Sequence, residues 1–182
     1  MGGGNGYVCA TRYSESTRMY LANNINNMKL VKNVCYGGFS LSPKGVKRYA
    51  ELKGKDCYFF KIDYKDMDKR YIPITLEEAE KEMMWFAYSV PNPQDFNLNV
   101  ADDDGLYKSA NERAETISLD IRTSDRTDPD LIKVVEELGG EHRKGASGRF
   151  AKLKIVEIPD GLDWEIDDDD GWETIREKAK KW

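Results

Sequence analysis

The chain has 182 residues, of which 40% are hydrophobic, 11% aromatic and 34% charged, and its net charge is −5. This composition predicts one domain with a true core and a well-solvated surface. It excludes a membrane-spanning helix, because no apolar run approaches about 20 residues, and the acidic total disfavours wholesale coating of nucleic acid. We see no signal peptide, and Gly6 stands where myristoylation needs Ser or Thr, so we expect a cytoplasmic protein.

The charge is unevenly distributed along the chain. Residues 1–75 carry 13 Lys and Arg against 6 Asp and Glu, whereas residues 76–182 carry 15 against 27. If the fold mixes the two halves, the surface charge averages out. If it does not, one face of the molecule is basic and can meet an anion.

The cysteine and histidine content limits the chemistry. The three cysteines, Cys9, Cys35 and Cys57, are odd in number and widely spaced. They are expected to act as small hydrophobic residues in a reducing compartment. His142 is the only histidine, which excludes metal sites built on several histidines.

Residues 1–27 are predicted to be an N-terminal extension, and residues 28–182 a single domain. Residues 29–36 alternate in the manner of a β-strand, with Leu30, Val34 and Tyr36 on one face.

The next signals predict a helix and a second strand. Ser42 is a good N-cap with Pro43 at the first helical position, and Gly54 is typical of the helix end. Residues 57–62 are rich in aromatic and β-branched side chains and predict a strand. Residues 71–74 are expected to be extended.

Further along, Thr75 is expected to cap a helix over residues 76–88, with acidic residues in its first turn. Residues 89–105 contain two prolines and three consecutive aspartates and predict an internal loop. We expect a short helix over 106–115 and a strand over 116–121.

The C-terminal third begins with a predicted helix over 129–138, started by Asp128-Pro129. Residues 151–158 predict a strand, which a turn joins to residues 162–166 in a hairpin. A final amphipathic helix is expected over 172–182. The fold class is therefore predicted as α+β: a single mixed sheet of about five strands with helices packed on it, and a C-terminal β-hairpin followed by a helix.

The first candidate site is the turn after the first strand. A strand, a glycine turn at Gly37-Gly38 and a helix start form one arrangement that holds phosphate, because glycines allow close approach to backbone N–H groups. Ser40 adds a hydroxyl, and Tyr36 adds a flat face for a base. The alternative is that the glycines only turn the chain while Tyr36 and Phe39 fill the core.

The second candidate site is the loop that follows the 129–138 helix. Residues 140–147 nearly match the phosphate loop GxxxxGK[ST], but Ala146 replaces the lysine and a helix, not a strand, comes before it, so we reject an NTPase. Exposed N–H groups and cations can still bind an anion without hydrolysing it. The alternative is a solvated surface loop. The candidate ligand-binding residues here are Arg143, Lys144, Ser147 and Arg149.

The acidic runs fail as calcium loops. With Gly171 as the loop glycine, Ile166 falls at the first ligand position and Glu173 at the apolar eighth position. The run from Asp167 to Asp170 is better explained as an acidic turn. No nucleophile–base motif is present either, so no catalytic residue, metal site or cofactor is predicted.

Two stretches, residues 28–54 and 126–173, carry the patterns NxCYGGFxLS, DPxLIxVVEELG and LKIVEIPD in that order. Together they resemble a family of short, functionally uncharacterised proteins encoded by phages and prophages. The resemblance implies a small cytoplasmic accessory protein of a virus or mobile element, and it brings no assigned catalytic residues. Such proteins often counter host immunity, some by sequestering nucleotide second messengers.

These observations leave three hypotheses. The leading one is a non-enzymatic protein that sequesters a small anionic, nucleotide-like ligand, with a site that can lie between the protomers of a homo-oligomer. The second is an inhibitor that binds a host protein through acidic surface, especially residues 102–104 and 163–170. The third is a metal-dependent enzyme that acts on nucleotides.

Overall fold

A computed structural model describes residues 27–63, 70–96, 118–119 and 126–178. Within these ranges the chain forms helices and small antiparallel sheets, which confirms the α+β class. The helices are α2 (Pro43–Leu52), α3 (Leu76–Ala79) and α5 (Pro129–Leu138), with a 3-10 turn at Pro93–Phe96. The strands are β1 (Asn27–Asn33), β2 (Tyr58–Asp63), β3 (Arg70–Ile74), β4 (Phe86–Tyr88), β5 (Leu153–Pro159), β6 (Trp164–Asp169) and β7 (Trp172–Glu177).

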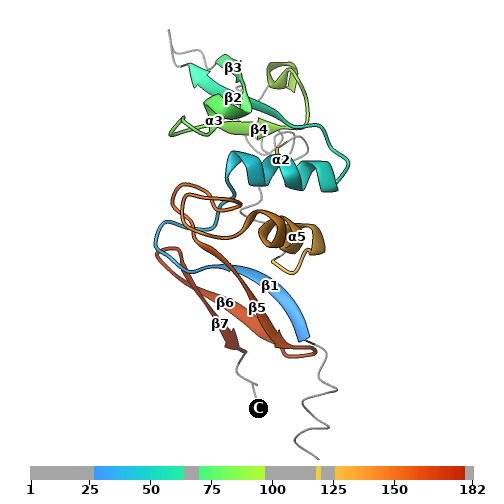
Figure 1. The fold of residues 1–182 in the computed structure, drawn as a ribbon, viewed down its shortest axis with the longest axis vertical. Helices are drawn as coiled ribbons and strands as arrows, with labels where there is room; N and C mark the ends of the chain where they lie inside the picture. Colours follow the sequence, from blue (N-terminus) through green and yellow to red (C-terminus); the bar gives the residue numbers. More distant parts are fainter. Residues whose placement is uncertain (1–26, 64–69, 97–117, 120–125, 179–182) are drawn as a thin grey trace, which may run out of the picture.

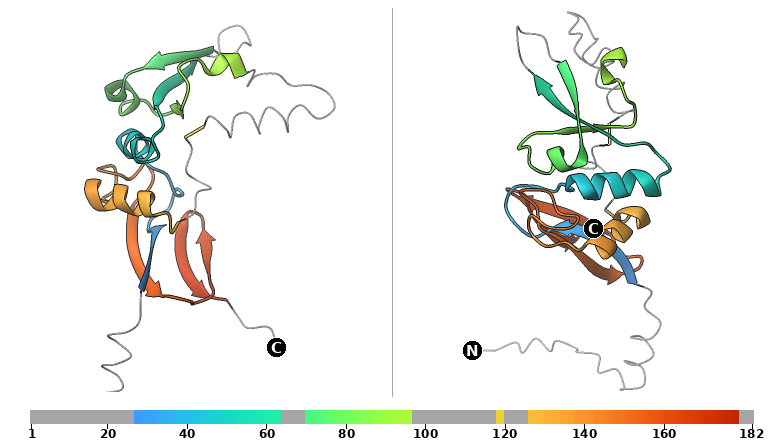
Figure 2. Two further views of the ribbon diagram at one scale, coloured as in Figure 1. Left: turned by 90° about the vertical axis from the view of Figure 1, so that its right-hand side faces the viewer. Right: turned by 45° about the horizontal axis from the view of Figure 1, so that its top comes forward.

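Among the described residues the strands form three separate sheets in place of the predicted single one. β1 pairs with β5, β2 lies between β3 and β4, and β6 pairs with β7, all antiparallel. Helices α2 and α5 lie between the β2–β3–β4 sheet and the β1–β5 and β6–β7 pairs (Figure 1 and the left view of Figure 2). One continuous sheet cannot form because this helix layer separates β1 from β2.

The two helices of this layer begin where the sequence predicts. The Ser42 hydroxyl accepts a hydrogen bond from the Gly45 N–H, and the Asp128 carboxylate accepts one from the Asp130 N–H. Each helix has Pro at its first turn, where the missing N–H costs nothing. Leu131, which is fully buried, lies on the face of α5 that enters the core.

The main hydrophobic core crosses the helix layer and reaches the sheets on both sides. It joins Val31 and Leu153 of the β1–β5 pair to Phe59 and Ala87 of the β2–β3–β4 sheet, through the buried stripes of α2 and α5. A second cluster, formed by Phe60, Tyr71 and Tyr88, covers the other face of the three-stranded sheet. The halves of the molecule are therefore held together by apolar contacts.

A buried polar network fixes the β6–β7 hairpin against β1. Glu173, which is only 1% exposed, accepts hydrogen bonds from the Asn33 N–H at 2.7 Å and from Arg126 Nη2 at 2.8 Å. The Arg126 guanidinium also lies 3.3 Å from the centre of the Phe39 ring. The Asn33 amide donates to the Gly171 carbonyl at 2.6 Å, so three elements share one set of polar contacts.

Two predicted helices are wrong in part or entirely. The predicted helix over 76–88 ends after one turn, because Phe86–Tyr88 extends and pairs with β2. The predicted final helix is strand β7 as far as Glu177, and residues 179–182 lie outside the described residues. Pairing with a neighbouring strand outweighs helical periodicity in both segments.

Other predictions need correction in detail. The predicted hairpin between residues 151–158 and 162–166 does not form, because β5 pairs with β1 and β6 pairs with β7. β1 ends at Asn33, so Tyr36 is not on a strand face, and its side chain is 64% exposed. Asn27, assigned to the extension over residues 1–27, is the first residue of β1. The rest of that extension, most of the loop 89–105 and the elements over 106–121 lie outside the described residues, apart from residues 89–96 and 118–119.

Among the described residues, no helix combines the length and apolar character that crossing a bilayer requires.

Candidate functional site

The two bends that the sequence singles out lie side by side. Leu41 forms a bridge with Ser147, and the Gly148 N–H donates to the Ser40 carbonyl at 2.9 Å. The Ser42 N–H donates to the Ala146 carbonyl at 2.8 Å. Segments more than 100 residues apart in the sequence are thus joined by backbone hydrogen bonds.

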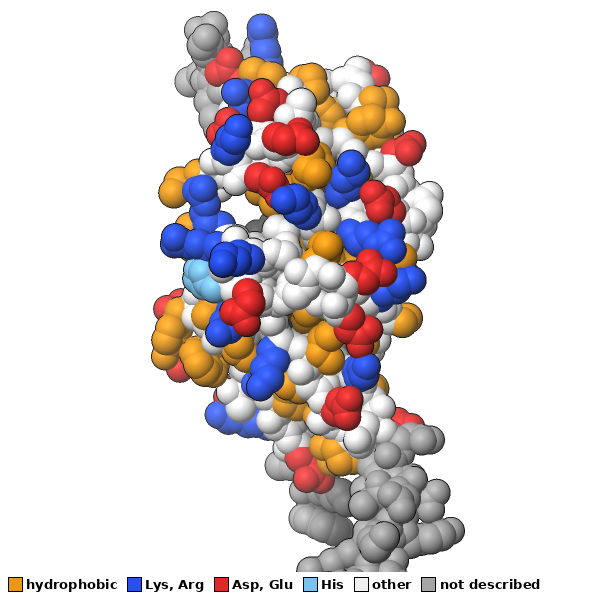
Figure 3. Space-filling view, in the orientation of Figure 1, with side chains coloured by type: hydrophobic (Ala, Val, Ile, Leu, Met, Phe, Trp, Pro, Cys, Tyr) orange, Lys and Arg blue, Asp and Glu red, His pale blue; other side chains and the backbone are white. Residues whose placement is uncertain are grey.

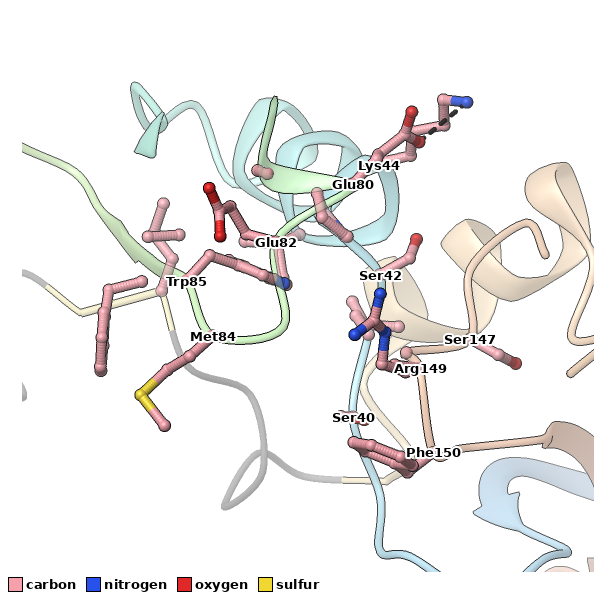
Figure 4. Close-up of a pocket in the computed structure, with 18 of the residues that line it drawn as sticks. Ser40, Ser42, Lys44, Glu80, Glu82, Met84, Trp85, Ser147, Arg149 and Phe150 are labelled. Carbon is pink, nitrogen blue, oxygen red and sulfur yellow. Dashed lines mark ion pairs between the residues drawn. The ribbon is translucent and has the colours of Figure 1, made fainter. Parts of the chain in front are cut away.

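A cleft of about 1060 Å³ opens beside this junction. One wall is the loop over residues 143–150, the other is the segment over residues 79–88, and the floor is the chain from Ser40 to Val46. In Figure 4, Met84 and Trp85 lie on one side of the cleft, and Arg149 and Phe150 lie on the other. The cleft therefore has walls from both halves of the molecule.

The basic side chains around the cleft differ in how they are engaged. Lys44 is paired with Glu80 at 2.9 Å. Of the described residues, none forms an ion pair with Arg143, Lys144 or Arg149, and the Arg149 side chain donates a long hydrogen bond of 3.5 Å to the Lys81 carbonyl.

The two carboxylates of the lining are already neutralised. Glu80 is paired with Lys44, and Glu82 with Lys61 at 3.8 Å. Figure 3 shows the result: Lys and Arg side chains gather beside the single histidine, at the edge of the molecule where the loop that carries it lies. The cleft rim is thus positively biased.

The rim also carries large apolar side chains that the fold leaves in solvent. Met83 is 73% exposed, Met84 61% and Phe150 48%. Trp85 is better anchored, because its ring lies edge-on to Phe59 at 5.6 Å. Exposed methionines beside an aromatic wall are adaptable contacts for a flat apolar ligand group.

The predicted residues of the 143–149 loop divide into two groups. Ser147 is buried, and its hydroxyl donates to the Gly140 carbonyl at 2.8 Å and accepts from the Leu153 N–H at 3.0 Å. It points away from the Met84 side in Figure 4 and holds the loop in place. Arg143, Lys144 and Arg149 are exposed at the cleft, so these cations are the part of the loop that can reach a ligand.

The structure separates Tyr36, Gly37 and Gly38 from the cleft. Only Ser40 of the glycine turn lines it. Tyr36 lies against Trp172 of β7, with ring centroids 5.7 Å apart. The Gly37 N–H donates to the Asp170 carbonyl at 3.3 Å, so the glycine pair receives the tip of the β6–β7 hairpin.

Sequence reasoning missed the opposite wall of the cleft. Met84 and Trp85 of this wall were not predicted as site residues, and neither were Lys44 on the floor and Phe150 on the loop wall. The expected helix over 76–88 hid the opposite wall, because it placed Met84 and Trp85 on an ordinary helix.

The cysteine and acidic side chains offer little further chemistry. Burial, the largest effect, raises the pKa of the Cys57 thiol to about 11, so its reactive thiolate is scarce at neutral pH. Among the residues that the structure describes, no three His, Cys, Asp or Glu side chains gather as metal ligands.

Comparison of the chain with family models, with curated proteins and with solved structures gives no match.

Proposed function

We propose that this protein is a non-enzymatic binding protein that captures and sequesters a small anionic, nucleotide-like ligand in the cleft. The observation that carries the proposal is the juxtaposition of three cations without carboxylate partners in the described chain with an apolar wall across the cleft. The cations are Arg143, Lys144 and Arg149.

Each wall suits a different part of such a ligand. Arg143 and Arg149 can offer forked N–H donors to phosphate oxygens, and Lys144 adds a compact charge. A base would lie against the Met84–Trp85 wall, where aromatic and sulfur contacts are favourable. A neutral nucleoside would contact only the Met84–Trp85 wall, and inorganic phosphate would contact only the cations of the loop wall.

The size of the cleft supports the same ligand class. Its volume of about 1060 Å³ lies just above the range of about 300–1,000 Å³ that is usual for small-molecule sites. A nucleotide or a dinucleotide is a better match than a single phosphate ion. In the viral or mobile-element setting that the sequence resemblance implies, the ligand would be a nucleotide immune messenger.

The test is isothermal titration calorimetry of the full chain with AMP, ADP-ribose and cyclic mono- and dinucleotides. Adenosine and pyrophosphate serve as half-ligands, since each carries only one part of a nucleotide. At least one nucleotide is expected to bind more tightly than either half-ligand. Arg149→Ala and the double variant Arg143→Ala/Lys144→Ala are expected to weaken it about tenfold or more, since hydrogen bonds to charged groups contribute about 1.5–3 kcal/mol.

The matched control is Lys154→Ala, an exposed lysine of β5 away from the cleft lining. It removes the same charge and should leave affinity unchanged. The proposal is wrong if no nucleotide binds, or if Lys154→Ala weakens binding as much as Arg149→Ala does. Recovery of the ligand unchanged by mass spectrometry after incubation is expected, and a cleaved product would contradict the non-enzymatic part.

A further inference from the structure

The outer face of the β6–β7 hairpin is a second surface with its own chemistry. Residues directly opposite each other in an antiparallel pair share one face, and the outward pairs are Asp169 with Trp172, Asp167 with Thr174 and Glu165 with Arg176. The other face carries Ile166 and Ile175 and the buried Glu173. Most side chains of the outer face remain exposed.

This face carries an exposed pair of aromatic rings. Tyr36 is 64% exposed and Trp172 is 42% exposed, and their rings lie 5.7 Å apart with a tilt of 47°. A backbone hydrogen bond holds the two rings together, because the Gly37 N–H, next to Tyr36, donates to the Asp170 carbonyl, near Trp172. Two large rings left in water beside each other are costly for a surface without a partner, and Tyr and Trp are the usual centres of protein interfaces.

The carboxylates near this pair are of two kinds. Asp167 is paired with Arg176, Asp163 with Lys178, and one oxygen of Asp168 accepts a hydrogen bond from the Gly171 N–H at 2.7 Å. These groups serve the hairpin itself.

A second set is available to a partner. Within the described chain, Glu165, Asp169 and Asp170 form no ion pair, and all three are exposed. The face therefore combines an aromatic platform with unneutralised negative charge.

We propose that this face, formed by Tyr36, Trp172, Glu165, Asp169 and Asp170, docks a Lys- or Arg-rich segment of a protein partner. A cationic side chain lies over the aromatic pair, where the negative ring faces attract it, and the neighbouring carboxylates accept its hydrogen bonds. The charge is opposite to that of the cleft rim, so the two sites take ligands of opposite sign. The surface is independent of the proposed nucleotide site.

The structure also tells which carboxylates to change. Replacing the whole acidic run would remove the Asp168 contact to Gly171 and the Asp167 pair with Arg176, and so would damage the hairpin. Asp169→Asn and Glu165→Gln remove only charge. Tyr36 is not part of a strand, so Tyr36→Ala is expected to fold. It therefore tests the aromatic platform even if Trp172→Ala fails to fold.

The experiment is NMR titration of the full chain, labelled with ¹⁵N, with a synthetic ten-residue peptide of alternating Arg and Gly and with its Glu–Gly counterpart. The Trp172 indole N–H, assigned with Trp172→Phe, is expected to shift with the Arg peptide only. Tyr36→Ala and Trp172→Ala are expected to weaken binding about fivefold or more, and the double variant Asp169→Asn/Glu165→Gln to a similar degree.

Two controls separate this site from general charge attraction. Asp56→Asn/Asp160→Asn removes two exposed carboxylates outside the β6–β7 hairpin, and Tyr58→Ala removes an exposed aromatic ring on β2. Both should leave affinity within about twofold of the parent protein. Equal weakening by the carboxylate control, or no weakening by Tyr36→Ala, would overturn the proposal. So would a Trp172 shift that follows protein concentration and not peptide, since the occupant would then be a second copy of this chain.

Discussion

Asp128 shows how one side chain joins two helices. Its carboxylate caps α5 through the Asp130 N–H, accepts the Tyr49 hydroxyl of α2 at 2.6 Å, and contacts Lys53 at the end of α2. Burial works to raise the pKa of Asp128, but the hydrogen bonds from Tyr49 and Lys53 outweigh it, and the pKa is lowered from 3.8. The folded protein therefore stabilises the ionised form of this group.

Asp128→Ala is expected to cost about 1–2 kcal/mol of unfolding free energy at pH 7, since a helix cap and a charged hydrogen bond are both lost.

Asp128→Asn keeps an N-cap acceptor and loses the charge. Because the folded pKa is lowered, the charge contribution is fully present above pH 3.8 and is lost as the pH falls through the folded pKa. Urea unfolding of the parent and Asp128→Asn proteins between pH 7 and pH 2.5 should show their difference shrinking at the acidic end. A constant difference would contradict this account, and exposed Asp56→Asn is the control.

At the scale of an element, the β6–β7 hairpin depends on a glycine-to-glycine contact. Gly171 has a φ of +89°, and a Cβ there would overlap the Gly38 nitrogen and lie 2.8 Å from the Gly37 nitrogen. At Gly37, with a φ of +119°, a Cβ would lie 2.6 Å from the Phe150 carbonyl oxygen. Gly37 is thus explained by the close approach of the Phe150 backbone, whereas Gly38 has open space around its missing Cβ and is explained by its φ of +86°.

Gly171→Ala is expected to destabilise the protein more than Gly161→Ala does. Gly161 has a similar φ of +79° but nothing within 4 Å of its missing Cβ, so its substitution carries only the left-handed backbone cost of about 1–2 kcal/mol. In Gly171→Ala the new Cβ also overlaps the glycine turn, and steric overlap of this kind typically lowers the unfolding free energy by about a further 1–3 kcal/mol. Chemical denaturation of the two variants measures the difference, and equal losses would show that the hairpin tip is free to move away from the turn.

At the scale of the molecule, a single core is shared by both halves. Arg48 of α2 forms a forked pair with Glu137 of α5 on the exposed side of the helix layer, at 2.6 and 3.1 Å. Exposed pairs of this kind contribute little. The connection between the halves therefore depends on apolar contacts across α2 and α5, and on Leu131 in particular, which has no solvent exposure.

Leu131→Ala is expected to cost about 2–5 kcal/mol, the range for large-to-small changes in a closed core. Because the core is continuous, both halves should lose stability together. Hydrogen exchange should show equal loss of protection in β2 and in β5, and Met83→Ala, at a site 73% exposed, should change stability by less than about 0.5 kcal/mol. Loss confined to β5 would mean that the halves unfold separately.

Signals that act within a few residues were sufficient for part of this fold. Ser42-Pro43 and Asp128-Pro129 start helices through a side-chain oxygen and a preset φ, and neither needs a distant partner. The strands at Tyr58–Asp63 and Leu153–Pro159 followed from local composition and alternation. The α+β class could be predicted from such elements alone.

Only the tertiary structure decided the sheets and the cleft. Residues 76–88 and 172–182 have helical periodicity, but Phe86–Tyr88 and Trp172–Glu177 lie where β2 and β6 offer unpaired backbone, and pairing satisfies the N–H and C=O groups that face the partner strand. The same folding back brings Met84 and Trp85 opposite Arg149, and turns Gly37 and Gly38 toward the hairpin. Short-range physics determined where helices begin in this chain. Which strands pair, and hence which side chains face one cleft, depends on contacts between residues far apart in sequence, and local pattern does not encode them.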